Sequence, residues 1–174
     1  MRILGLDPGY AILGWGVVDY ENNKFTPVAF GAVTTEAGEP MPKRLNHLYR
    51  SVMEIIAAYE PDMTSIEELF FSNNAKTAIF VGEARGVAIL ACSNSGVEIA
   101  EYTPGQIKQA VTGYGKAEKQ QVQFMVKQIL GLKEVPKPDD TADALAAALC
   151  HGYTSGGLTG LSRLEKAILA QEMK

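Results

Sequence analysis

The chain has 174 residues, of which 47% are apolar and 21% charged, and its formal net charge is −4. This length and composition fit one globular domain with a buried core. No apolar run reaches the ~18 residues that a membrane span needs, and the first residues lack the pattern of a signal peptide, so we expect a cytoplasmic protein with no membrane association.

The first third of the sequence is predicted to form three strands followed by a helix. An apolar run at residues 2–8 ends at Pro-Gly, a second at 13–24 ends in an Asn-Asn turn, and a third at 25–35 alternates apolar and polar residues. Tight links between sequential strands indicate an antiparallel meander. From residue 42 to 59 apolar residues recur at helical spacing, and Pro61 ends this predicted helix.

The rest of the chain alternates strands and helices. We expect strands at 63–68 and 96–102, and helices at 74–93, from 103 onward, at 119–131 and at 139–153. Such alternation is typical of an α/β layered domain, in which these two strands run parallel to the first.

The last residues depart from this pattern. After a Gly-rich stretch, Ser162 and Glu165 have the spacing of a capping box ahead of further apolar residues. We therefore expect one domain over residues 1–153 and an extension over 154–174 that forms a short helix or a loose tail.

The negative net charge argues against nucleic-acid binding, yet the charge is unevenly distributed. Between residues 106 and 137 two glutamates stand against six lysines, at positions 108, 116, 119, 127, 133 and 137, which gives this stretch a local charge of +4. Two divalent cations would also offset the total of −4. The acidic average therefore does not exclude a metal-dependent enzyme with an anionic substrate.

Three acids crowd the start of the last predicted helix, namely Asp139, Asp140 and Asp143 in "PKPDDTADALAAALCHGY". One carboxylate suffices to cap the free N–H groups at a helix start. Either of the first two acids shares a helix face with Asp143, where like charges repel unless a cation lies between them. Helix geometry does not decide which of the two acts with Asp143.

Further acids follow two predicted strands. Asp7 ends the first strand, and Glu67 and Glu68 end the fourth, where ligands gather in open α/β sheets. Strand alternation places Glu67 and Glu68 on opposite faces without choosing between them, and a turn role in Asp-Pro-Gly is the alternative for Asp7. Together with the acids of the last helix, these residues offer hard oxygen ligands that suit Mg²⁺ or Mn²⁺, and no cysteine or histidine pair has zinc-binding spacing.

Four ordered blocks, "LGLDPG", "SIEELFFSNNAKTAIFVGEARGVA", "YTPGQIKQAVTGYGKAEKQQV" and "DDTADALAAAL", closely resemble the RuvC family of crossover junction endodeoxyribonucleases. The resemblance covers residues 1–153. It implies an RNase H-like α/β fold, with a mixed five-stranded sheet (a three-strand antiparallel meander plus parallel strands) flanked by helices. It also implies a homodimer that binds four-way (Holliday) DNA junctions and nicks two strands of like polarity with Mg²⁺, leaving 5′-phosphate and 3′-hydroxyl ends.

Matched motif by motif, the resemblance implies that Asp7, Glu67, Asp140 and Asp143 are the catalytic residues and the ligands of two Mg²⁺ ions, for which Mn²⁺ can substitute. Asp7 would be the ligand that both ions share, and Asp139 would be left as the helix cap. Two ions ~3.5–4 Å apart can stabilise the attacking and leaving oxygens of a phosphoryl transfer. The same resemblance makes the RuvA–RuvB branch-migration complex a candidate partner.

Five further residues are predicted to contact DNA. Phe70 follows the motif glutamate, and in the family the aromatic residue there stacks on a base near the crossover. Lys76, Lys108, Lys116 and Lys119 are expected to contact phosphates, because of the local positive charge and because "QIKQ" and "AEK" match family positions near the scissile phosphate. The alternatives are a core aromatic residue and a solvated lysine face.

Two more features have weaker implications. His151 lies about two helical turns after Asp143, and we do not expect it to bind metal. Gly82 and Gly86 stand among alanines in the helix predicted at 74–93. Small residues permit the close approach of a partner, and in the family the corresponding helix helps to form the dimer.

Other function classes share parts of this pattern. An actin-like ATPase or sugar kinase has the same RNase H-like core and strand–Asp–turn start, but that class binds its nucleotide between two such domains and 174 residues supply one. A related nuclease acting on other structured nucleic acid, or an inactive junction-binding module, would carry much of the same sequence. Substrate comparison and a metal-dependent nicking assay separate these alternatives.

Overall fold

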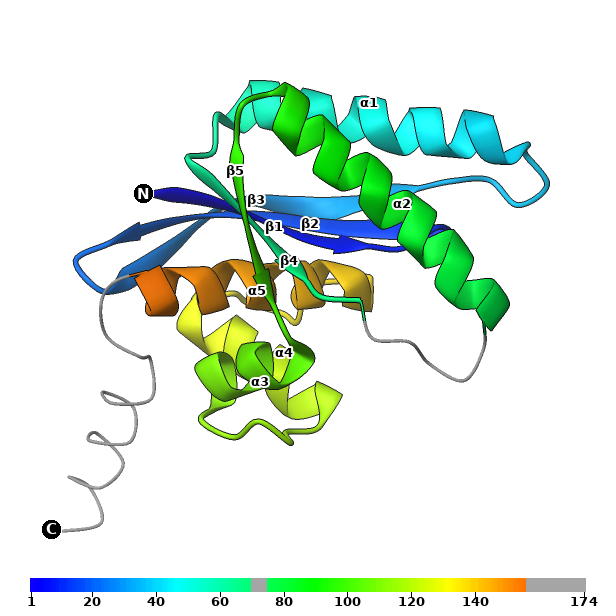
Figure 1. Cartoon of the computed structure of the whole chain (residues 1–174). Helices are drawn as coiled ribbons and strands as arrows, with labels where there is room; N and C mark the ends of the chain where they lie inside the picture. Colours follow the sequence, from blue (N-terminus) through cyan, green and yellow to red (C-terminus); the bar gives the residue numbers. More distant parts are fainter. Residues whose placement is uncertain (70–74, 156–174) are drawn as a thin grey trace, which may run out of the picture.

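A mixed five-stranded sheet forms the centre of this computed structural model, which describes residues 1–69 and 75–155 (Figure 1). The strands, in chain order, are β1 (Arg2–Pro8), β2 (Ile12–Glu21), β3 (Lys24–Thr34), β4 (Met63–Glu67) and β5 (Glu98–Tyr102). Their order in the sheet is β3-β2-β1-β4-β5. The first three strands form the predicted antiparallel meander, β4 pairs in parallel with β1, and β5 pairs in parallel with β4. The α/β fold class expected from the sequence is confirmed.

Helices cover both faces of the sheet. On one face lie α1 (Met41–Tyr59) and α2 (Ala75–Asn94), and on the other lie α3 (Pro104–Thr112), α4 (Lys119–Ile129) and α5 (Asp139–Ser155) (Figure 1). Over the ranges 1–69 and 75–155, no helix combines the length and the apolar character needed to cross a membrane. The extension expected at 154–174 lies, from residue 156 on, outside the described residues, so the predicted domain division stays a prediction.

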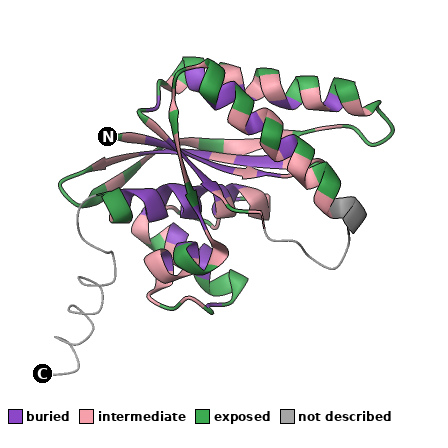
Figure 2. Cartoon of the chain, viewed as in Figure 1, coloured by how far each residue is buried: buried purple, intermediate pink, exposed green. Residues whose placement is uncertain are grey.

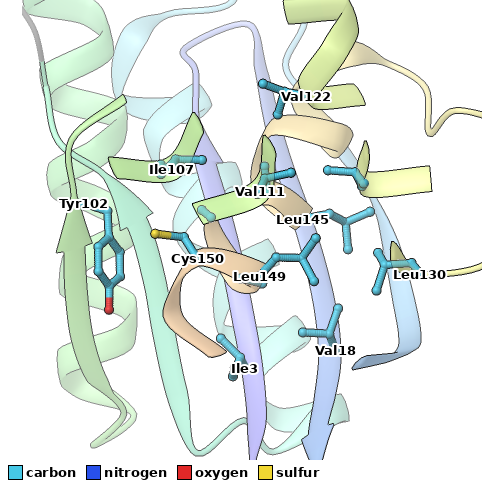
Figure 3. Close-up of a cluster of buried hydrophobic side chains, with 14 of the residues drawn as sticks. Ile3, Val18, Tyr102, Ile107, Val111, Val122, Leu130, Leu145, Leu149 and Cys150 are labelled. Atoms are coloured by element: carbon cyan, nitrogen blue, oxygen red, sulfur yellow. The ribbon is translucent and has the colours of Figure 1, made fainter. Parts of the chain in front are cut away.

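Strand alternation divides the core into two layers. Ile3 of β1 packs with α3, α4 and α5, whereas Leu4 and Leu6 pack with α1 and α2. Figure 2 shows the buried residues gathered along the sheet and along α5. In the layer next to α5, Leu145 and Leu149 lie among the side chains of the sheet and of α3 (Figure 3). The odd-numbered positions of β1 therefore face α5.

Glycines in the sheet let the backbone of α5 approach closely. A Cβ at Gly5 of β1 would collide with the carbonyl oxygen of Ala144, and one at Gly14 of β2 would collide with that of Asp140. A Cβ at Gly16 would meet the α5 side chains instead. Any larger residue at these positions would push α5 away from the strands.

Two hydroxyl groups fix α5 against the sheet. The Ser65 hydroxyl of β4 donates to the carbonyl oxygen of Ala147 at 2.6 Å, and the Thr141 hydroxyl donates to that of Gly31 in β3 at 3.0 Å. These bonds tie both the start and the middle of α5 to strands that flank β1 and β2. The start of α5 is thereby held at the edge of the sheet where β1 ends.

Candidate active site

Two carboxylates lie at the carboxyl ends of neighbouring parallel strands. Asp7 is the last residue but one of β1, and Glu67 is the last residue of β4. The two strands pair in parallel up to the residues just before them. Both acids occupy odd positions, which face α5 as Gly5 and Ser65 do. Glu68, the alternative to Glu67, follows the end of the strand and is exposed.

The start of α5 brings two more carboxylates to this edge. Asp140 and Asp143 both lie within its first turns. In the ladder between β1 and β2, Asp7 is paired with Gly14, the glycine whose Cβ would collide with the Asp140 carbonyl oxygen. Gly14 therefore places the start of α5 directly beside Asp7. Three elements that are remote in sequence thus bring the four predicted site residues together.

Burial and like charges raise the pKa of Asp7 to about 7, from an ordinary 3.8. Burial is the largest cause, the negative charges of Asp143, Glu67 and Asp140 follow, and the positive charge of Lys119 opposes them. Asp143, Glu67 and Asp140 are therefore close enough for their negative charges to act on Asp7. The negative charge of such a cluster is reduced either by protonation of a carboxylate or by binding of a cation.

The pKa values of Glu67 and Asp143 are also raised. Burial, followed by the charge of Asp143, raises the pKa of Glu67, while Lys108 and Lys119 oppose the rise. Burial also raises the pKa of Asp143, against the hydrogen bond and the charge of Lys119. The nearby lysines thus offset only part of the excess negative charge at this edge of the sheet.

Two lysines provide the positive charge. The ammonium group of Lys119, the first residue of α4, lies 2.9 Å from a carboxylate oxygen of Asp143. Partial burial acts to lower the pKa of Lys119, but the hydrogen bond and charge of Asp143, with the charges of nearby acids, raise it above its ordinary value. Lys108 of α3 and Lys119 line a pocket of ≈ 270 Å³ together with Glu67 and Asp143. Cationic and anionic groups therefore share one concave surface.

Side-chain caps hold the two lysine-bearing helices at their starts. At α3, the Thr103 hydroxyl accepts from the Gln106 N–H at 3.1 Å, and the Gln106 side chain accepts from the Thr103 N–H at 2.8 Å. At α4, the Gln121 side chain accepts from the Glu118 N–H at 2.8 Å. These bonds satisfy N–H groups that a helix start leaves free, and they fix the direction in which each helix leaves its loop.

Lys116, the other predicted phosphate contact whose side chain the structure describes, does not line this pocket. Lys116 is exposed on the loop between α3 and α4, and it lines a separate groove of ≈ 630 Å³. Of the predicted phosphate contacts with described side chains, Lys108 and Lys119 are therefore the ones that the structure brings to the carboxylates. Phe70 lies outside the described residues, and so does the side chain of Lys76, so both stay predictions.

Asp139 differs from the helix cap that we expected. It is the first residue of α5 rather than the residue before the helix. Its carboxylate accepts a hydrogen bond from the Lys137 ammonium group at 3.0 Å and lies 3.7 Å from that of Lys119. The hydrogen bond from Lys137 lowers the pKa of Asp139. Asp139 thus pairs with two lysines instead of capping the helix.

His151 faces the core. Its Nδ1 lies 2.8 Å from the hydroxyl oxygen of Tyr102, and both residues are buried. Burial lowers the pKa of His151, so the ring is neutral near pH 7. His151 is thus hydrogen-bonded inside the core, and the expectation that it does not bind metal stays a prediction.

The chemistry of the site fits a hard divalent cation. Four carboxylates supply oxygen ligands, and burial, together with the charges of the other three, raises the pKa of Asp7. Among the residues that the structure describes, no three Asp, Glu, His or Cys side chains are arranged closely enough to hold an ion as they stand. Lys119 supplies the counter-charge of Asp143 in this arrangement. Binding of a cation would therefore require the carboxylate side chains to draw together.

Two residues that shape the site were not anticipated from the sequence. Gly14 sets the distance between Asp7 and α5, and a glycine inside a strand is a signal of close backbone approach that could have identified it. Arg85 of α2 donates from Nε to the carbonyl oxygen of Glu67 at 3.3 Å and forms an ion pair with Glu101 of β5. No local pattern indicates Arg85, because its contacts join separate elements.

A family model described as "Crossover junction endodeoxyribonuclease RuvC" matches residues 3–151. A protein of that name from Caldanaerobacter subterraneus subsp. tengcongensis is 58% identical over 161 residues, which cover 92% of this chain and 98% of the relative. The Thermus thermophilus RuvC structure matches with a TM-score of 0.83 and 39% identity, covering 90% of this chain and 97% of that one. T. thermophilus RuvC in complex with a Holliday junction substrate matches with a TM-score of 0.82 and 37% identity, at the same coverage. With its fold and its motifs in agreement, this chain belongs to the RuvC family of crossover junction endodeoxyribonucleases.

Proposed function

We propose that this chain is a metal-dependent endonuclease that resolves four-way (Holliday) DNA junctions in recombination and repair. The observation that carries the proposal is the convergence of β1, β4 and α5, which gathers four carboxylates where β1 and β4 end, in a member of the RuvC family. Relatives named crossover junction endodeoxyribonuclease support the reaction, and a solved RuvC in complex with a Holliday junction substrate supports the choice of substrate. The reaction is the hydrolysis of a phosphodiester bond.

Asp7, Glu67, Asp140 and Asp143 would hold the metal. We infer two Mg²⁺ ions per site, with Mn²⁺ able to substitute, because all four side chains are hard oxygen donors. When bound, divalent cations lower the pKa of water and stabilise the departing 3′ oxygen. Asp7 is assigned as the shared ligand, since β1 pairs with β4, which carries Glu67, and since Gly14 places the start of α5 beside Asp7. The products carry 5′-phosphate and 3′-hydroxyl ends.

Lys108 and Lys119 orient the scissile phosphate in this proposal. Both line the pocket that also contains Glu67 and Asp143, so a phosphodiester beside the carboxylates would come within reach of two ammonium groups. Phosphate contact would also give Lys119 an anionic partner in place of Asp143 once that carboxylate binds metal.

More distant DNA contacts rest on charge and on the family resemblance. Lys116, exposed beside its own groove, and Lys76 are proposed to contact phosphates away from the scissile bond. Phe70 is proposed to stack on a base near the crossover. The RuvA–RuvB branch-migration complex stays a predicted partner on the same resemblance.

A homodimer is the proposed working form, because symmetric nicking of two strands requires two active sites. Ile79, Gly86 and Leu90 are exposed and are spaced to share one side of α2, and the two large side chains are 60% and 52% exposed. Such a face gains stability when a second copy buries it. Light scattering should report a dimer at assay concentrations, and a monomer alone would contradict this part of the proposal.

Substrate comparison tests the function. A four-way junction, a duplex, a flap and an RNA hybrid are each incubated with and without Mg²⁺, and we expect Mg²⁺-dependent nicking of the junction in preference to the others. Equal cleavage of duplex or RNA would indicate a different RNase H-like nuclease. Junction binding without nicking would indicate an inactive module, and ATP binding in calorimetry would indicate the actin-like ATPase class.

A further inference from the structure

Arg85 joins α2 to the two parallel strands that end beside the site. Its side chain is only 14% exposed, whereas Glu83 on the same helix is exposed. Its Nε donates to the carbonyl oxygen of Glu67 at 3.3 Å, and its guanidinium group forms an ion pair with Glu101. Glu67 is the last residue of β4, and Glu101 lies next to the end of β5. One largely buried cation therefore contacts both strand ends.

The peptide group between Glu67 and Glu68 is held at both of its polar atoms. Its carbonyl oxygen accepts from Arg85, and its N–H donates to the carbonyl oxygen of Tyr102 at 2.8 Å. A peptide group is planar, so fixing this plane restricts the backbone torsion on the carboxyl side of the Glu67 Cα atom. That torsion, together with the strand pairing before it, sets the direction of the Glu67 side chain. Arg85 is thus bonded to the group that aims the carboxylate.

We propose that Arg85 is a positioning residue for Glu67 and links α2 to the geometry of the metal site. The inference rests on the proposed function, because it takes Glu67 as a metal ligand. Arg85 also lines a pocket of ≈ 210 Å³ together with Asp7 and Glu67, so it borders the carboxylates directly. The planar guanidinium serves two acceptors at fixed angles, which a lysine ammonium on a flexible stem does not reproduce. Polar groups behind metal ligands commonly tune affinity in this way.

Arg2 provides a matched control at the other end of β1. Its side chain donates to the carbonyl oxygen of Tyr59 at 2.9 Å and pairs with Asp19 at 2.9 Å, which is the same combination of one carbonyl and one carboxylate. It lies at the start of β1, whereas Asp7 lies near the end. Arg2→Lys therefore removes the same two kinds of contact, one to a carbonyl oxygen and one to a carboxylate, at a place remote from the site.

The test compares Arg85→Lys, Glu101→Gln and Arg2→Lys with the parent, all as the full chain. Mn²⁺ affinity is measured by isothermal titration calorimetry, single-turnover nicking of a four-way junction is measured at saturating DNA, and gel shifts without metal report junction binding. For Arg85→Lys we expect Mn²⁺ affinity and the nicking rate to fall ~10–100-fold while junction binding is retained. Glu101→Gln should shift both quantities in the same direction by a smaller factor, and Arg2→Lys should shift neither.

An unchanged Mn²⁺ affinity in Arg85→Lys, or equal losses in Arg85→Lys and Arg2→Lys, would overturn the proposal. If Arg85→Lys does not fold, the same measurements on Glu101→Gln test the proposal instead. That variant keeps Arg85 and removes the charge of its ion-pair partner. A parent that nicks no junction, yet binds Mn²⁺ with an affinity that depends on Arg85, would support the positioning role and contradict the proposed function. If the parent nicks junctions and Arg85→Lys nicks them at the same rate, the proposed function would be supported and the positioning role contradicted.

Discussion

Gly14→Ala perturbs the contact that places α5 beside Asp7. A Cβ at this position would lie 2.8 Å from the backbone nitrogen of Thr141 and closer still to the carbonyl group of Asp140. Real Cβ atoms essentially never come within 3.0 Å of such an atom, so relieving the contact with the Asp140 carbonyl oxygen requires the start of α5 to retreat by about 1 Å in a close-packed interior. The colliding atoms belong to the backbone, and no side-chain rotation relieves the contact.

This retreat should reduce the rate of cleavage more severely than it reduces stability. Overpacking of this kind costs ~1–3 kcal/mol of unfolding free energy. Catalytic groups need to be held within ~0.5 Å of their productive positions, and a misplacement of ~1 Å costs ~10²-fold in rate. Asp140 moves with α5 while Asp7 stays on β1, so we expect the nicking rate of Gly14→Ala to fall ~10²-fold.

Single-turnover nicking of a four-way junction in saturating Mg²⁺ measures the rate, and chemical denaturation measures the unfolding free energy. Gly105→Ala in α3 is the control, because a Cβ there meets only the Thr103 hydroxyl oxygen, at 3.9 Å. It should leave the nicking rate unchanged and raise the unfolding free energy by no more than ~0.4–1 kcal/mol, since alanine is favoured over glycine in a helix. A Gly14→Ala variant that nicks at the parental rate would refute the argument that close packing of α5 sets the geometry of the site.

Four further outcomes follow from the same site. Asp7→Asn should abolish nicking but preserve junction binding in gel shifts, and loss of both together would count against its role as a ligand. With its pKa raised to about 7, Asp7 stabilises the metal-free fold below pH ~4 and loses that contribution as pH rises through about 7, so Asp7→Asn should flatten the pH dependence of thermal unfolding. Lys119→Gln should slow nicking more than Lys116→Gln, because only Lys119 lies among the carboxylates, and equal effects would contradict this. Asp139→Asn should nick almost normally while Asp140→Asn falls by orders of magnitude, and the opposite result would shift the ligand assignment by one residue.

Much of the fold follows from local pattern. Short links force the first three strands to be neighbours, and the change from a period of two to a period of 3.6 marks α1 and α4. The alternation of later strands and helices requires parallel pairing beside β1, as observed. These features need no knowledge of contacts between residues that are remote in sequence.

The details of the site depend on such contacts. Alternation separates Glu67 from Glu68 but does not say which face α5 covers, and the hydrogen bond from Ser65 to α5 supplies that information. The partners of Asp139 are lysines from two other segments, Lys137 and Lys119, so a capping pattern read from the helix start pointed to the wrong role. The four metal ligands were predicted from the match to the motifs of the RuvC family and not from the geometry of strands and helices.

Incubation of a mobile four-way junction with the full chain, with and without Mg²⁺, tests the central claim most directly. In Mg²⁺ we predict paired nicks in two strands of like polarity, with 5′-phosphate and 3′-hydroxyl ends, and an intact junction when the metal is chelated. A junction that stays intact in Mg²⁺ under conditions where it is bound would contradict the account.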